Sequence, residues 1–246
     1  MSAALILAIA AQSLTARGNF PRKAAVVTDI DGTLFSFAGR ELSAGNREAL
    51  LQCIDSGIHV CLATGRIPGP WYEDLRDTQL PGLGPCVFGN GALVLDAAGK
   101  VIWECQLPKD IVSPILEYTR GGRAGGADSA RLCVLAATRW DGELRYCELA
   151  PLGRTPVTDL IDRAGEPSAV VLPDLDGFDE RSILKFVIWT VPGEVGWASM
   201  PDTVAAVRRA LRGTGATILD NSDDVTCHAM PCHDETSTMP CHVIRP

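Results

Sequence analysis

Two aspartates separated by one residue close an apolar run near the start of the chain. Residues 24–28 read Ala-Ala-Val-Val-Thr and are followed by Asp29, Ile30 and Asp31. Because side chains alternate along an extended strand, the two carboxylates are predicted to point the same way. Such a pair can hold a hard cation, attack phosphorus and exchange a proton with a leaving group. The pattern therefore indicates phosphate-ester hydrolysis through an aspartyl phosphate, with a simple polar turn as the alternative.

The surrounding elements are predicted to place these carboxylates at one edge of a parallel sheet. Apolar runs of strand length alternate with helical segments, and each run ends in a small or polar turn. The predicted strands are 24–30, 58–63 and 85–88, and the predicted helices are 41–56 and a segment around 71–76. A β-α-β-α-β order implies parallel strands with right-handed crossovers. Ligands of such sheets bind at the carboxyl ends of the strands.

A hydroxyl and a turn at the end of the second predicted strand suit a phosphoryl group. Thr64 follows residues 58–63 and is itself followed by Gly65 and Arg66. The threonine hydroxyl can donate to one phosphoryl oxygen, and backbone N–H groups of the turn and the next helix start can bind others. Because the strands are parallel neighbours, Thr64 is expected to lie beside Asp29.

Three segments together resemble a known family. They are Asp29–Leu34 (Asp-Ile-Asp-Gly-Thr-Leu), Ala63–Arg66 (Ala-Thr-Gly-Arg) and Gly89–Ala92 (Gly-Asn-Gly-Ala), the last followed by a predicted hairpin. In this combination the chain resembles the haloacid dehalogenase-like hydrolase superfamily, and within it the Cof-type phosphatases with a large α/β cap. The resemblance is sharp over residues 21–110 and looser to about residue 225.

The resemblance implies Mg²⁺-dependent dephosphorylation of small phosphorylated metabolites of the sugar-phosphate kind. By this resemblance Asp29 is the nucleophile and a metal ligand, and Asp31 is the acid/base whose backbone carbonyl also binds the metal. Thr64 and Gly65 hold the phosphoryl group, and Arg66 or Asn90 faces the substrate.

The fold class expected is α/β, with a Rossmann-like parallel-sheet core and an inserted α+β cap. Beyond the core, residues 93–95 with 101–103 and residues 131–139 with 143–149 are predicted hairpins, and residues 121–126 are a predicted flexible loop. The predicted boundaries are 1–20 for a leader or N-terminal extension, 21–106 for the core, 107–225 for the cap and 226–246 for a low-complexity Cys/His tail.

The chain departs from the family pattern after the predicted cap. Family members supply a lysine and a Gly-Asp-x-x-Asn-Asp segment there, and neither follows Leu219; the last lysine, Lys185, lies inside an apolar predicted cap strand. The sequence therefore predicts a core that is incomplete at its C-terminus and an activity weakened by truncation. It also predicts an exposed apolar edge at 24–30 that promotes self-association. The alternative is a non-catalytic relative that binds a phosphorylated ligand or a partner.

Composition narrows the remaining possibilities. A net charge of −8 argues against a nucleic-acid surface, and no apolar run is long enough to span a membrane. The nine cysteines follow no disulfide framework, which favours a cytoplasmic location. Because residues 1–20 could be a targeting segment, a plastid or another organelle is the alternative location. Three cysteines and three histidines within 227–242 leave a zinc-binding tail as a competing interpretation.

Overall fold

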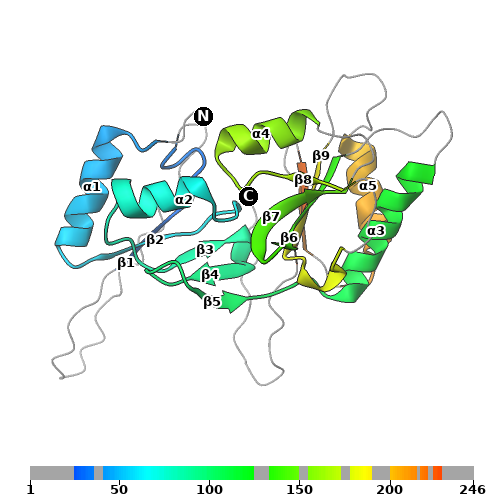
Figure 1. The fold of residues 1–246 in the computed structure, drawn as a ribbon, viewed down its shortest axis with the longest axis horizontal. Helices are drawn as coiled ribbons and strands as arrows, with labels where there is room; N and C mark the ends of the chain where they lie inside the picture. The colour runs from blue at the N-terminus through cyan, green and yellow to red at the C-terminus, as the bar shows by residue number, and fades with distance from the viewer. Residues whose placement is uncertain are drawn as a thin grey trace.

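The structure is a computed structural model of the whole chain. It describes residues 25–35, 41–124, 133–149, 155–172, 178–189, 200–214, 217–220 and 224–228. The predicted leader over 1–20 and most of the predicted tail lie outside these residues. Figure 1 shows two groups of helices and strands side by side along the long axis, one containing α1 and α2 and the other α3, α4 and α5.

The first group is built on five strands. They are β1 (Ala25–Thr28), β2 (His59–Leu62), β3 (Cys86–Phe88), β4 (Leu93–Leu95) and β5 (Val101–Glu104). β1 and β2 pair in parallel, a parallel bridge between Ala63 and Val87 links β2 to β3, and β3, β4 and β5 form an antiparallel meander. The parallel βαβαβ start and the hairpin after it are both confirmed.

Helices connect the parallel strands as predicted. α1 (Ala44–Asp55) joins β1 to β2, while α2 (Pro70–Asp74) and a π-helical turn η1 (Leu75–Gln79) join β2 to β3. The Ser43 hydroxyl accepts a hydrogen bond from the Asn46 amide at 3.1 Å and caps α1, as expected for a serine before a helix. Gly57, with φ of 76°, ends the helical region where the chain must turn into β2.

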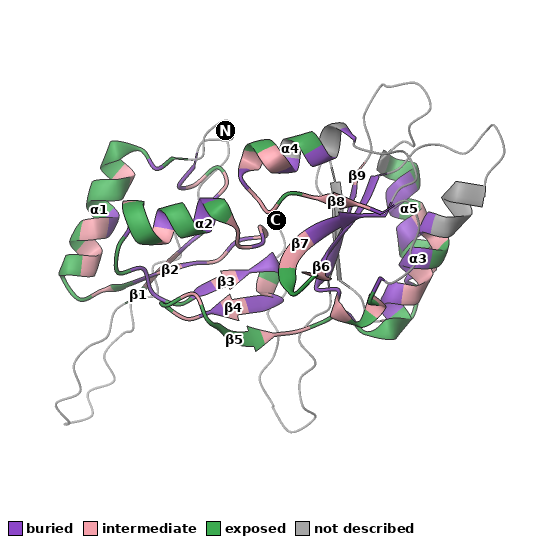
Figure 2. Ribbon diagram, viewed as in Figure 1, coloured by how far each residue is buried: buried purple, intermediate pink, exposed green. Residues whose placement is uncertain are grey.

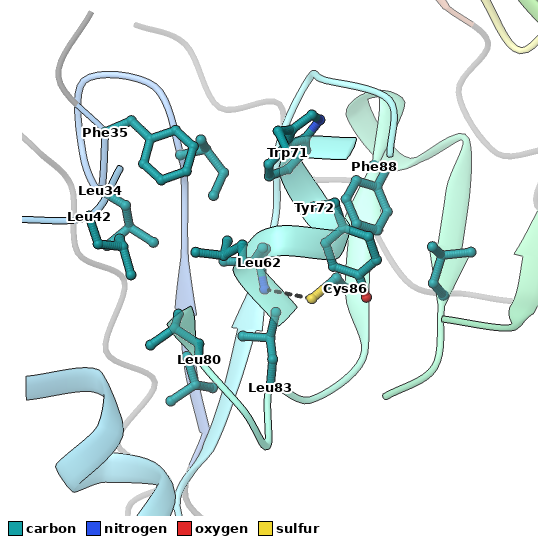
Figure 3. Close-up of a cluster of buried hydrophobic side chains, with 14 of the residues drawn as sticks. Leu34, Phe35, Leu42, Leu62, Trp71, Tyr72, Leu80, Leu83, Cys86 and Phe88 are labelled. Carbon is teal, nitrogen blue, oxygen red and sulfur yellow. Dashed lines mark hydrogen bonds between the residues drawn. The ribbon is translucent and has the colours of Figure 1, made fainter. Parts of the chain in front are cut away.

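A cluster of buried apolar side chains packs around β2 and β3 of this sheet (Figure 3). Phe35, Trp71 and Phe88 lie at its upper end, and their rings meet edge to face, with Trp71 6.3 Å from Phe35 and 6.1 Å from Phe88. Lower in the cluster, the Leu62 amide donates to the Cys86 sulfur at 3.4 Å and ties β2 to β3. The strand ends are therefore anchored on aromatic side chains.

The second group is a six-stranded sheet in the order β10-β11-β9-β6-β7-β8. Its strands are β6 (Cys133–Trp140), β7 (Glu143–Glu148), β8 (Val170–Val171), β9 (Lys185–Trp189), β10 (Thr217–Asp220) and β11 (Asp224–His228). Its helices are α3 (Lys109–Ala124), α4 (Pro156–Ala164) and α5 (Met200–Ala210), with short 3₁₀ turns η2 (Gly89–Gly91) and η3 (Glu180–Ser182) elsewhere. α3 and α5 cover one face of the sheet, whose central strands β6 and β9 are largely buried (Figure 2).

Two local predictions were wrong. The expected loop at 121–126 belongs up to Ala124 to helix α3, because its apolar side chains Ile111, Val112, Ile115 and Leu116 are buried on the sheet and outweigh the two glycines at its end. The six-stranded sheet of the second group also continues past residue 225, where the cap was predicted to end: β11 runs to His228 and pairs with β9, since strand pairing uses backbone groups and does not depend on sequence complexity. The first three residues of the predicted tail thus form part of the sheet.

β1 is an edge strand within the described part of the chain, where β2 is the strand that pairs with it. Ala25 is exposed on β1. We expect the protein to self-associate through this edge, and the substitution Ala25→Lys to suppress association by placing a charge there. Sedimentation velocity over a range of concentrations measures this directly. A wild-type sedimentation coefficient that does not change with concentration would contradict the expectation.

Among the residues that the structure describes, no helix has the length and apolar character needed to cross a membrane.

Candidate active site

The two aspartates lie where β1 ends. The turn after β1 is tight, because the Ile30 carbonyl accepts hydrogen bonds from the amides of Thr33, Leu34 and Phe35 at 3.3, 2.9 and 2.9 Å. Gly32 makes this turn possible with φ of 73°. Asp29 is therefore presented at an exposed position, with Asp31 immediately beyond it.

Asp31 and Arg66 form a two-pronged ion pair. Arg66 Nε lies 2.8 Å from Asp31 Oδ2 and Nη2 lies 2.5 Å from Oδ1. The guanidinium also stacks near Phe35 and Trp71, at 5.8 and 5.5 Å from the ring centroids. Arg66 therefore engages both carboxylate oxygens of Asp31.

The pKa of Asp29 is raised above its ordinary value. The main cause is partial burial of its carboxyl group, and the negative charge of Asp31 adds to it, while a backbone hydrogen bond at Ile30 and the charge of Arg66 act in the opposite direction. The raised pKa of Asp29 therefore reflects partial burial first, with the nearby charge of Asp31 as a smaller contribution.

Thr64 is held at the carboxyl end of β2 by the neighbouring turn. Its amide donates to the Val87 carbonyl at 3.0 Å, and its carbonyl accepts from the Asn90 amide at 3.2 Å. The Thr64 hydroxyl oxygen accepts the Arg66 amide at 3.2 Å. Since that oxygen acts as an acceptor towards the backbone, its own hydrogen is directed elsewhere.

Asn90 lies against the same loop. It has φ of 59°, between two glycines that also have positive φ, and is exposed. A side-chain carbon added at Gly65 would meet Asn90 Oδ1 at 2.9 Å, so glycine is what permits this approach. Thr64, Gly65 and Asn90 therefore lie together, and the ion pair of Arg66 with Asp31 links their loop to the turn after β1.

Three contacts from the second group of elements were not predicted. Arg66 Nη1 donates to the Ala164 carbonyl at 3.0 Å, the Ile67 amide donates to a Glu166 oxygen at 3.3 Å, and Lys185 Nζ donates to the Gly65 carbonyl at 2.5 Å. One feature of the sequence could have indicated such a contact. Lys185 is a charged residue within the apolar run Ile183–Trp189, and lysine is almost never fully buried without a partner.

A cleft of about 440 Å³ opens beside this region. It lies between α2, the β4–β5 hairpin and the β6–β7 hairpin, and none of the six predicted site residues lines it. In the described portion of the chain, His, Cys, Asp and Glu nowhere gather in a group of three or more that could hold a metal ion. The zinc-binding interpretation of 227–242 lies almost wholly outside the described residues.

Comparisons with known proteins place this geometry in context. A family model described as haloacid dehalogenase-like hydrolase matches residues 26–125. The curated 5-amino-6-(5-phospho-D-ribitylamino)uracil phosphatase YwtE of Bacillus subtilis is 29% identical over 93 residues, which are 38% of this chain and 31% of that protein. The alignment thus spans about a third of the length of this relative.

Solved structures share the fold over most of the chain. A phosphatase of the haloalkanoate (HAD) superfamily from Bacteroides thetaiotaomicron is 19% identical, with a TM-score of 0.59, and the match covers 88% of this chain and 72% of that one. A subclass IIB sugar phosphatase of the same superfamily is 16% identical, with a TM-score of 0.61, and the match covers 85% and 70%. Residues 26–125 therefore match the sequence pattern of haloacid dehalogenase-like hydrolases, and the chain shares the fold of these solved structures.

Proposed function

We propose that the protein is a Mg²⁺-dependent phosphatase of small phosphorylated metabolites, sugar phosphates among them, that acts through an aspartyl phosphate on Asp29. One observation carries the proposal: Asp29 and Asp31 at the end of β1 are joined by Arg66 to the Thr64 loop at the end of the adjacent parallel strand β2. A nucleophile, an acid/base and phosphate-binding groups then meet at one sheet edge, where ligands of such sheets bind.

Each residue has a chemical role in this proposal. An Asp29 oxygen attacks phosphorus as the bond to the leaving alkoxide breaks, and water later hydrolyses the aspartyl phosphate. Asp31 protonates the alkoxide and then takes a proton from that water. While Asp31 carries the proton, its ion pair with Arg66 must be open. The Thr64 hydroxyl and nearby amides bind phosphoryl oxygens, and Asn90 faces the substrate.

The donor set fits Mg²⁺. Partial burial is the main cause of the raised pKa of Asp29, and the negative charge of Asp31 adds to it; a bound cation would favour the charged carboxylate against both. Mg²⁺ is commonly held by one or two carboxylates together with substrate phosphate oxygens. The Asp29 carboxylate and the Asp31 carbonyl would hold it. When bound, it neutralises charge on the nucleophile and the phosphoryl group.

The names of the relatives support the proposed substrate class. The matched curated protein is named for dephosphorylating a phosphoribityl compound, and one matched structure is a sugar phosphatase. Small phosphomonoesters of polyols and sugars are therefore the substrates to try first. The pairing of both Asp31 oxygens with Arg66 favours the alternative, a relative that binds a phosphorylated ligand without turnover.

Phosphate release from a panel of sugar and polyol phosphates tests the proposal. We expect turnover that requires added Mg²⁺ and is lost when the metal is removed with a chelator, because the attacking Asp29 carboxylate and the phosphate then repel each other without a cation between them. A folded, Mg²⁺-supplied protein that binds a phosphomonoester and releases no phosphate would establish the non-catalytic alternative instead.

A further inference from the structure

Two consecutive peptide groups of the Thr64 loop (residues 64–67) are each held by hydrogen bonds on both sides. In the peptide between Gly65 and Arg66, the carbonyl accepts from Lys185 Nζ at 2.5 Å and the amide donates to the Thr64 hydroxyl oxygen at 3.2 Å. A trans peptide is planar, with its carbonyl and amide pointing in opposite directions. Fixing the carbonyl on Lys185 therefore also aims the amide at Thr64.

The next peptide is held in the same manner. Its amide, on Ile67, donates to the Glu166 carboxylate at 3.3 Å, and its carbonyl, on Arg66, accepts from the Gly89 amide at 2.9 Å. In each peptide one partner comes from the first group of elements and the other from the second. Arg66 lies between the two peptides, so their orientation sets the start of the side chain that reaches Asp31.

Lys185 and Glu166 are built into the second group of elements. Lys185 begins β9 and is only 4% exposed, with its ammonium 5.5 Å from the Tyr146 ring centroid. Glu166 follows α4; burial raises the pKa of its carboxyl, while the charge of Lys185 and a hydrogen bond with Tyr146 act to lower it. The two side chains thus compensate one another electrostatically, as buried ions must.

The loop itself is buried against that group. Ile67 is fully buried in an apolar cluster with Leu135 and Val187, which come from β6 and β9. The Trp71 amide, after the loop, also donates to the Gly165 carbonyl at 3.3 Å. Contacts from the second group therefore surround residues 65–67 closely enough to determine their conformation.

We propose that Lys185 and Glu166 are positioning residues that set the two peptide groups around Arg66 and thereby aim the Thr64 hydroxyl and the Arg66 guanidinium. The inference rests on the phosphatase function proposed above. Because the Thr64 oxygen accepts the Arg66 amide, its hydrogen is left to donate to a phosphoryl oxygen. Without Lys185 the Gly65–Arg66 peptide is free to rotate, and this alignment is lost.

Two readouts test the proposal in the full chain with Lys185→Met. Amide exchange followed by NMR should show Arg66 and Ile67 exchanging roughly tenfold faster, the effect of losing one hydrogen bond's net stabilisation. In phosphate release, kcat should fall about 10- to 100-fold with KM changed by less than about threefold. Misaligned hydrogen-bond donors weaken stabilisation of the transition state, where charge develops, more than they weaken substrate binding. Lys185→Arg, which keeps a cationic donor, should restore most of both.

Two further variants separate positioning from stability. The double variant Lys185→Met/Glu166→Gln removes both charges, so it avoids an uncompensated buried carboxylate; it should exchange and turn over like Lys185→Met even where the single variant folds poorly. Val207→Ala destabilises the second group from α5, away from the loop, and should leave both readouts unchanged. Exchange rates and a kcat equal to wild type in the double variant would overturn the proposal.

A wild-type protein without turnover would refute the phosphatase function alone, and the amide-exchange data would still decide the role of Lys185.

Discussion

Replacing Asp29 with asparagine is expected to lower phosphomonoester turnover by at least about 10³-fold, because the amide removes the attacking oxygen and with it the covalent route. The substitution is nearly isosteric at an exposed position. It also removes the repulsion that Asp31 exerts on a charged Asp29. The melting temperature should therefore stay the same or rise slightly while activity disappears.

The comparison of turnover and melting temperature makes the result specific. Asp55→Asn, on the far end of α1, is a matched control that should leave both unchanged. An Asp29→Asn variant that keeps a tenth or more of wild-type turnover would rule out Asp29 as the nucleophile. Trapping of radiolabelled phosphate on the wild type, absent from the variant, would identify the covalent intermediate directly.

Replacing Arg66 is expected to lower kcat/KM by about 10²- to 10³-fold, since one guanidinium makes several contacts at the site. It bonds both oxygens of Asp31, donates to Ala164 and stacks near two aromatic rings. Lysine retains the charge but lacks the planar fork, so Arg66→Lys should recover only part of the loss seen in Arg66→Met. Steady-state kinetics on the best substrate of the panel measures both.

The chain offers a closely matched control for this experiment. Arg76 also grips one carboxylate with two nitrogens, at 2.6 and 2.9 Å from Asp77, and lies 5.5 Å from the Tyr72 ring. The Asp77 side chain of this pair is 58% exposed, and exposed ion pairs contribute little. Arg76→Lys should leave kcat/KM within about twofold of wild type. Equal losses in both lysine variants would show that Arg66 has no special role.

Much of the core was predictable because its signals are local. Apolar runs of four to six residues, the Ser43 cap and the Gly57 stop each act within one element, so the sequence shows them directly. The parallel pairing of β1 and β2, which ends both strands at one edge, was also predictable from the alternation of apolar runs and helical segments. These predictions needed no knowledge of how the second group of elements packs.

The contacts that were not predicted join residues far apart in the chain. Lys185 and Gly65 are 120 positions apart, and Glu166 and Ile67 are 99 apart. No local pattern states where β9 will lie relative to β2, so Lys185 looked like an unusual strand residue and nothing more. Helix α3 was missed for a related reason: its terminal glycines suggest a loop until the sheet that buries Ile111 and Ile115 is known.

The turn at residues 89–91 has a consequence for how tolerant the protein is of mutation. All three residues have positive φ, yet a side chain added at Gly89 or Gly91 would meet no atom closer than 3.5 Å. Gly65 is the reverse case, with no positive φ and a clash at 2.9 Å. In a saturation scan Gly89 and Gly91 would be intolerant because of their backbone conformation, whereas a small side chain at Gly65 needs only a shift of the exposed Asn90 side chain. Intolerance at a position beside this site is therefore not, by itself, a sign of contact with substrate.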